Sequence, residues 1–193
     1  MSGFRHLGER LVHQGHLWRV VVAEFAGPDG VPFQRDIVRS PGAVAVVPLL
    51  RPSAAPRGSG SVADWSVILV RQFRPAIGAE VVEVPAGMRD VEGEAPVVTA
   101  RRELVEEVGY EADVVEPLTC FHQSVGMTDS TTHVFVATGL RHVGDDRKGP
   151  EETAMTTLVV PLREALEQVA AGVITDAKTA LGLLLTERWL ERR

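Results

Sequence analysis

The sequence has a single cysteine, Cys120, among 193 residues, and it has no long run of uncharged apolar residues. One cysteine permits neither an intramolecular disulfide nor a thiolate cluster for zinc. No apolar run reaches the length of a membrane span, and the N-terminal residues lack the apolar core of a signal peptide. We therefore expect a cytoplasmic protein with no membrane partner.

The sequence also lacks a surplus of basic residues, since 20 Lys and Arg stand against 26 Asp and Glu and give a net charge of −6. A protein that binds nucleic acid through its surface depends on positive charge, so we expect no nucleic acid partner. This charge remains compatible with a free nucleotide. At 45% hydrophobic residues, the chain is long enough to bury one sizeable core.

A helix is predicted where Pro96 suits the first turn, the run from Val98 to Val108 has no helix breaker, and Gly109 is a natural left-handed stop. Glu103 and Glu107 lie four residues apart on this helix, and Glu106 follows Glu103 by three. Residues at these spacings share one helix face. The sequence therefore predicts a helix with three carboxylates on one side.

Like charges on one helix face repel each other by a few tenths of a kcal/mol per pair, so a cation should compensate them. Three carboxylates suit a hard divalent ion with oxygen ligands, Mg²⁺ first and Mn²⁺ as a substitute. A solvated helix with Leu104 and Val108 facing the core would show the same pattern. Gly87 and Glu94 precede the helix at definite intervals and favour the metal site, because Glu94 could cap the helix amides.

These residues resemble the Nudix box, the signature of the Nudix hydrolases. The positions that match the family spacing are Glu94, Arg102, Glu103, Leu104, Glu106, Glu107 and Gly109. Six residues, where the family has five, separate Gly87 from Glu94, and Tyr110 stands where an aliphatic residue is usual. Because the extra residue falls in a loop, where insertions are tolerated, we expect the site to be retained.

The resemblance implies an α/β fold, a Nudix-type α/β/α sandwich with a mixed β-sheet. It also implies a metal site of Glu103, Glu107 and the backbone carbonyl of Ala86, which needs no particular side chain. Glu106 would join the catalytic group as a further ligand or as a partner of the ligands.

Four further box residues would support the site structurally, namely Gly87, Glu94, Arg102 and Gly109. Arg102 would orient a glutamate of the helix, and Glu94 would steady the junction between the loop and the helix. For both residues, a surface ion pair of little value is the other interpretation.

A metal ion held in this way would neutralise charge on a diphosphate and lower the pKa of a bound water, so hydrolysis of a phosphoanhydride is expected. The water also needs a base, which in many relatives comes from a loop outside the box. Glu151 and Glu152 lie in such a segment and are the candidate bases, not separable from sequence. A solvated acidic loop is the alternative interpretation.

The layout from Arg39 to the end of the chain resembles the ADP-ribose pyrophosphatase branch of the family. The matching features are Arg39, Gln72, Arg74, the sequence VPAGM at the box entrance and GVITDAKT before the last predicted helix. The resemblance implies that Arg39 and Arg74 contact the diphosphate of the substrate, for which guanidinium groups are suited. A surface ion pair is the alternative for each arginine.

Two positions depart from this branch: Val125 replaces the usual proline of Ser-Pro-Gly, and Ser130 stands where glutamate is common. The preferred substrate is therefore open. We expect hydrolysis of ADP-ribose to AMP and ribose 5-phosphate, or of another nucleotide sugar or dinucleotide. A module that only senses a nucleotide is the third hypothesis, which the retained box glutamates disfavour. Trp18 could stack on adenine or pack in a dimer.

Two regions are expected, a β-ribbon at residues 1–38 that could form a homodimer and a Nudix hydrolase domain at residues 39–193. Strands are predicted at residues 17–25, 31–38, 43–50, 65–70, 114–121, 132–137 and 156–160, and helices at 162–171 and 176–193. Residues 80–85 lead into the box. The first two strands flank a strong turn signal at residues 27–30 and form a hairpin.

Overall fold

A computed structural model describes residues 3–51, 62–148 and 153–193. The chain divides into two compact units, and each is described by itself. The first unit comprises Met1–Gly42 and Phe121–Thr131, and the second comprises Ala43–Cys120 and Thr132–Arg193. Within the described ranges, no helix is long and apolar enough to cross a membrane.

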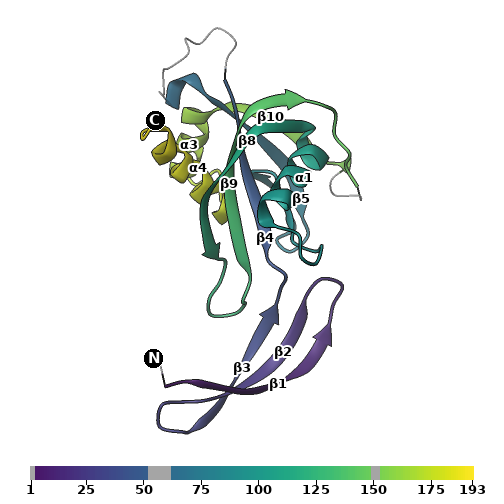
Figure 1. The fold of residues 1–193 in the computed structure, drawn as a ribbon, viewed down its shortest axis with the longest axis vertical. Coiled ribbons are helices and arrows are strands. Elements are labelled where there is room, and N and C mark those ends of the chain that lie inside the picture. Colours follow the sequence, from purple (N-terminus) through teal and green to yellow (C-terminus); the bar gives the residue numbers. More distant parts are fainter. Residues whose placement is uncertain (1–2, 52–61, 149–152) are drawn as a thin grey trace. The chain divides into compact units, whose positions relative to one another are not determined.

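The first unit contains an antiparallel sheet in the order β1-β2-β3 (Figure 1). Its strands are β1 (Arg5–Gln14), β2 (Arg19–Ala26) and β3 (Pro32–Arg39). The predicted hairpin of β2 and β3 is confirmed, but the expected two-stranded ribbon is wrong because β1 adds a third strand. All of β1 is exposed, so no buried face gives it an alternating apolar pattern. A homodimer formed through this sheet stays a prediction.

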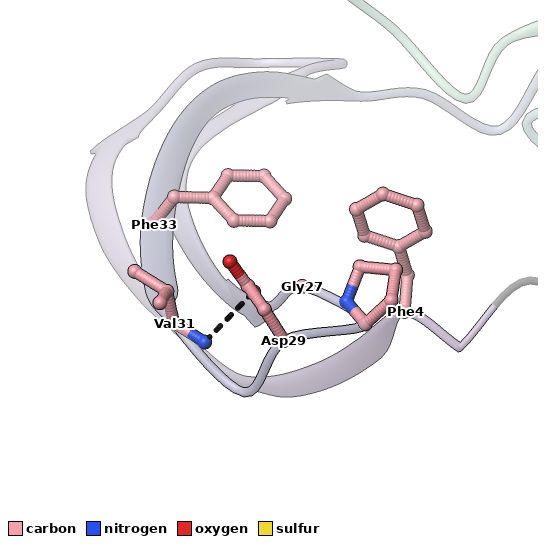
Figure 2. Close-up of a pocket in the computed structure, with 6 residues that line it drawn as sticks. Phe4, Gly27, Asp29, Val31 and Phe33 are labelled. Carbon is pink, nitrogen blue, oxygen red and sulfur yellow. Dashed lines mark hydrogen bonds between the residues drawn. The ribbon is translucent and has the colours of Figure 1, made fainter.

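The turn predicted at residues 27–30 joins β2 to β3. Figure 2 shows the Asp29 carboxylate accepting a hydrogen bond of 3.0 Å from the backbone N–H of Val31, which is how aspartate stabilises such turns. The rings of Phe4 and Phe33 meet edge to face with centroids 6.1 Å apart. The pocket beside this turn contains none of the predicted site residues.

The second unit is built on a mixed sheet with the order β10-β5-β4-β9-β8, in which β6 pairs with β5 and β7 pairs with β4. Its strands are β4 (Ala43–Leu50), β5 (Ser66–Arg74), β6 (Ala79–Glu83), β7 (Ala86–Met88), β8 (Tyr110–His122), β9 (Thr131–His142) and β10 (Thr156–Pro161). The pair β4 and β9 is parallel, whereas β5 pairs antiparallel with β4, β6 and β10. The predicted mixed sheet is confirmed.

Helices cover both faces of this sheet (Figure 1). They are α1 (Pro96–Val108), α3 (Leu162–Ala170) and α4 (Ala177–Leu190), and a 3-10 turn, η1, spans Val62–Asp64. Alternate residues of β4 face opposite sides of the sheet. Val46 packs in one cluster with Leu104 of α1, while Val47 approaches Gly182 of α4. The predicted α/β/α sandwich is therefore confirmed, with the carboxylate-bearing helix on one face.

The N-terminus of α4 is bonded to the segment between β6 and β7. The hydroxyl of Thr179 accepts a bond of 2.9 Å from the backbone N–H of Val84 and donates one of 2.6 Å to the carboxylate of Asp176. Thr179 and Val84 are both completely buried. This helix therefore fixes the backbone just before β7, the strand that begins at Ala86.

Replacing Thr179 by Val should lower the free energy of unfolding by about 1–3 kcal/mol, because it leaves the buried N–H of Val84 without an acceptor. Thr186→Val is the matched control on the same helix. The Thr186 hydroxyl is also buried but has no hydrogen-bond partner among the described residues. Its loss should be neutral or stabilising in urea unfolding. Equal destabilisation by both substitutions would contradict this role of Thr179.

Candidate active site

Two of the three box carboxylates on α1 are buried. The exposed fractions of Glu103 and Glu107 are 7% and 4%, respectively, whereas the side chain of Glu106 is 21% exposed. Helical spacing explains this, because Leu104 and Val108 anchor α1 to the sheet and draw the adjacent positions inward. A buried carboxylate is costly unless it is paired and hydrogen-bonded, so the partners of Glu103 and Glu107 define the site.

The carboxylate of Glu107 lies against the backbone of Ala86. Its Oε2 accepts a hydrogen bond of 3.0 Å from the Ala86 N–H. Ala86 is fixed in turn because it begins β7, which pairs with β4 at Ala45, and because the preceding Pro85 carbonyl accepts a 2.9 Å bond from Val46. The structure thus brings together two of the predicted metal ligands from positions far apart in the sequence.

Glu103 lies against the next residue, Gly87. A Cβ atom built on Gly87 would lie 2.0–2.3 Å from the carboxylate atoms of Glu103, far closer than any allowed contact. Any side chain at position 87 would displace the Glu103 carboxylate, and glycine lets that carboxylate lie beside the backbone next to Ala86. The three predicted ligands, Ala86, Glu103 and Glu107, share one small region, while their role in binding metal stays a proposal.

Arg102 neutralises part of this negative charge. Its Nη1 lies 2.7 Å from Glu103 Oε1 and 2.9 Å from Glu106 Oε2, and its Nη2 lies 3.6 Å from Glu94 Oε2. Partial burial lowers the pKa of Arg102, but the charges of Glu103, Glu106 and Glu94 outweigh it and raise the pKa above its ordinary value. The guanidinium is thus in contact with the glutamates that the sequence expects it to orient.

The two ends of α1 depend on different residues. In the part of the chain that the structure describes, Glu94 does not cap the helix amides as expected: the N-cap is Ala95, without a side-chain cap, and the Glu94 carboxylate accepts a 2.7 Å bond from the Thr99 hydroxyl. This still ties the loop to the first turn. At the other end, Gly109 adopts a left-handed φ of 75° and its N–H bonds to Val105, which confirms the predicted stop.

The segment after β9 also contacts the end of α1, which the sequence does not indicate. Arg147 Nε donates a 2.8 Å bond to the carbonyl of Glu107, and its Nη1 donates one to Met155. Lys148 Nζ lies 3.1 Å from Glu106 Oε1. Basic side chains suit the carbonyl end of a helix, but no local signal connects residues this far apart in the sequence.

The candidate bases Glu151 and Glu152 lie outside the described residues. Their role in accepting the proton of the attacking water stays a prediction.

Arg74, at the end of β5, forms a two-bond ion pair with Glu83 of β6. Arg74 Nε and Nη2 each lie 2.6 Å from a carboxylate oxygen of Glu83, which is only 1% exposed. The bond to Glu83 is the main cause that raises the pKa of Arg74, and the charge of Glu107 adds to it. Arg74 therefore has an ion-pair partner and also lies within electrostatic range of the box carboxylates.

The other two predicted substrate residues belong to the first unit. Arg39 Nη1 donates a 3.1 Å bond to Asp129, and Arg39 Nε donates one of 3.2 Å to Glu9, which is the main cause that raises the pKa of Arg39. Arg39 also lines a groove of this unit together with the exposed Val125. Trp18 is half exposed where β1 leads into β2. Substrate contact by Arg39 and Trp18 stays a prediction.

Across the described ranges, no three His, Cys, Asp or Glu side chains converge closely enough to form a metal centre. The donors around Ala86 are nonetheless all oxygen atoms, two buried carboxylates and a strand carbonyl. This donor type fits a hard divalent cation, which keeps several waters and needs few protein ligands.

The NUDIX domain family model matches residues 41–181 of this chain. The chain belongs to the Nudix hydrolase family. It is 33% identical to the ADP-ribose pyrophosphatase of Bacillus subtilis (strain 168) over 177 residues, covering 92% of this chain and 89% of that protein. Identity to the ADP-ribose pyrophosphatase of Mycobacterium tuberculosis (strain ATCC 25618 / H37Rv) is also 33%, over 94% of this chain and 82% of that protein.

A solved structure supports the Nudix fold. The crystal structure of an ADP compounds hydrolase superposes with a TM-score of 0.78 at 21% identity, covering 98% of this chain and 95% of that one. At this identity the likeness concerns the fold alone. Nudix hydrolases generally use divalent metal ions, which agrees with the oxygen donors of the box.

Proposed function

We propose that this Nudix protein hydrolyses the diphosphate bond of ADP-ribose in the presence of Mg²⁺ and releases AMP and ribose 5-phosphate. The observation that carries the proposal is the convergence on β7, where Glu107 bonds to Ala86 and Glu103 lies against Gly87. The similarity of nearly the whole chain to ADP-ribose pyrophosphatases supports the choice of substrate.

Each site residue has its own role in the proposed reaction. Glu103, Glu107 and the Ala86 carbonyl would hold Mg²⁺, which when bound supplies charge neutralisation and a more acidic water. Glu106 would act as a further metal ligand or as a partner of the ligands.

Arg102 holds the glutamates in place through its contacts with Glu103 and Glu106. The guanidinium of Arg74 binds phosphate oxygens through charge-assisted hydrogen bonds, and Arg39 does so as well. Glu151 or Glu152 accepts the proton of the attacking water.

Another nucleotide sugar or a dinucleotide is the second candidate substrate, favoured by two departures from the branch. Val125 is 82% exposed and occupies the position of the usual proline, and Ser130 is only 5% exposed where a glutamate is common. Neither change touches the metal-binding region. Both positions lie between β8 and β9, where a change would affect the preferred substrate and leave the reaction type unchanged.

The purified protein should release AMP from ADP-ribose when Mg²⁺ is present, and chromatography of the nucleotides would measure the rate. Removing the metal with EDTA should abolish turnover, and Mg²⁺ or Mn²⁺ should restore it. A panel of nucleotide sugars and dinucleotides, assayed in parallel, compares substrates by kcat/KM. Faster cleavage of a panel member would transfer the assignment to that substrate, whereas binding without cleavage of any compound would support a sensing module.

A further inference from the structure

The ion pair of Arg74 has a buried anchor that the proposed reaction does not use directly. Glu83 receives two bonds from Arg74 and a third from Lys178 of α4, which also bonds to Asp176. The side chain of Glu83 is 2% exposed and that of Arg74 is 41% exposed. One end of this pair is therefore fixed inside the protein, while the other reaches the surface.

The bonding pattern fixes the guanidinium in one orientation. A carboxylate that accepts two parallel N–H bonds sets both the position and the plane of an arginine head. Within the described residues, Arg74 uses Nε and Nη2 for Glu83, so both N–H groups of Nη1 remain available for another acceptor. A phosphate oxygen is an acceptor of the required charge.

Lys178 supports the ion pair of Glu83 with Arg74 and leaves Arg74 with positive charge that can bind an anion. Burial raises the pKa of Glu83, but the bonds from Arg74 and Lys178 outweigh it and bring the pKa below its ordinary value. Glu83 is therefore an anion shared between two cations. Because Lys178 neutralises part of the charge of Glu83, Glu83 does not fully cancel the positive charge of Arg74.

The anchor is continuous with the backbone of the candidate metal site. After Glu83, the Val84 N–H is bonded to Thr179, the Pro85 carbonyl accepts from Val46, and the Ala86 N–H is bonded to Glu107. Each residue from 83 to 86 is thus held by a hydrogen bond from a different element or side chain. The position of Arg74 is tied to that of the carboxylates through only three peptide bonds.

We propose that Glu83, supported by Lys178, is a positioning residue that holds the guanidinium of Arg74 to bind one phosphate of a diphosphate substrate. This inference rests on the proposed function. Glu83 itself does not touch the substrate, and its effect on the reaction passes through Arg74.

The test is the pair of kinetic constants for Glu83→Gln with ADP-ribose and Mg²⁺, or with the panel compound that the wild-type protein cleaves best. Loss of the two-bond ion pair between Glu83 and Arg74 should raise KM about tenfold and change kcat less than threefold. The reason is that the lost contact stabilises the bound substrate and the transition state equally. Glu111→Gln, which removes the exposed ion pair of Glu111 with Arg141, is the matched control and should change neither constant.

A double-mutant cycle separates positioning from a general structural role. In an Arg74→Ala background, Glu83→Gln should add less than a twofold further rise in KM, because the residue through which it acts is gone. The same tenfold rise in both backgrounds would overturn the inference. Thermal melting of all four proteins checks folding, and Glu83→Asp, which keeps the charge but shortens the reach, replaces Glu83→Gln if the latter does not fold.

Binding of a methylene-bridged, non-hydrolysable analogue of ADP-ribose, measured by calorimetry, distinguishes failure of this inference from failure of the proposed function. If the wild-type protein binds the analogue but cleaves nothing, the hydrolase proposal fails, and a tenfold weaker Kd for Glu83→Gln would still support positioning. Equal Kd values for wild type and Glu83→Gln would overturn it. If the wild-type protein neither binds the analogue nor cleaves any panel compound, both proposals are overturned.

Discussion

Replacing Glu107 by Gln is expected to lower kcat for diphosphate hydrolysis by on the order of 10³-fold. The amide has almost the shape of the carboxylate, and its oxygen can still accept the bond from the Ala86 N–H. It lacks the negative charge that a divalent ion requires of its ligand. Lewis-acid assistance by such an ion contributes several kcal/mol to stabilising the transition state, and each 1.36 kcal/mol corresponds to a factor of ten in rate.

The measurement is the kcat of Glu107→Gln at saturating substrate over a range of Mg²⁺ concentrations. Glu111→Gln provides the comparison, since Glu111 lies on β8 in an exposed ion pair with Arg141. Its kcat should match that of the wild-type protein. If Glu107→Gln kept more than a tenth of the activity at every Mg²⁺ concentration, Glu107 would not be a metal ligand in the reaction.

The helix that carries this glutamate was predictable because its signals are local. Pro96 at the first turn and the left-handed Gly109 after the last turn mark its two ends, and the structure places α1 between them. The apolar runs of β4 and β5 are similarly self-contained, since both strands are buried along most of their length. Strand β1 has no such signal, because all of its residues are exposed.

Contacts between distant residues could not be predicted in the same way. The pairing of Arg74 with Glu83 depends on the register of β5 and β6, and the third partner, Lys178, comes from α4. The bond from Arg147 to the carbonyl of Glu107 similarly joins a loop to a helix end. A charged residue in isolation shows only that it needs a partner or solvent. Which partner it meets is decided by the tertiary fold, so family resemblance could indicate Arg74 but not its anchor.

Gly87 shows how a residue can be essential through the space it leaves. Gly87→Ala should lower kcat/KM by about 10²-fold and weaken metal binding, because the new Cβ would fall 2.0–2.3 Å from the Glu103 carboxylate and displace it. Displacing a carboxylate by about 1 Å is enough to disturb catalysis to this extent. Turnover of ADP-ribose and calorimetric titration with Mn²⁺ would measure the two effects.

A shortened partner provides the decisive control. Glu103→Asp removes one methylene from the side chain that meets the new Cβ, so Gly87→Ala should cost less in the Glu103→Asp background than in the wild-type protein. Such non-additivity would show that Gly87 acts through Glu103. If the two substitutions instead multiplied their effects, Gly87 would act through the β7 backbone, and the contact with Glu103 would not explain why glycine is needed there.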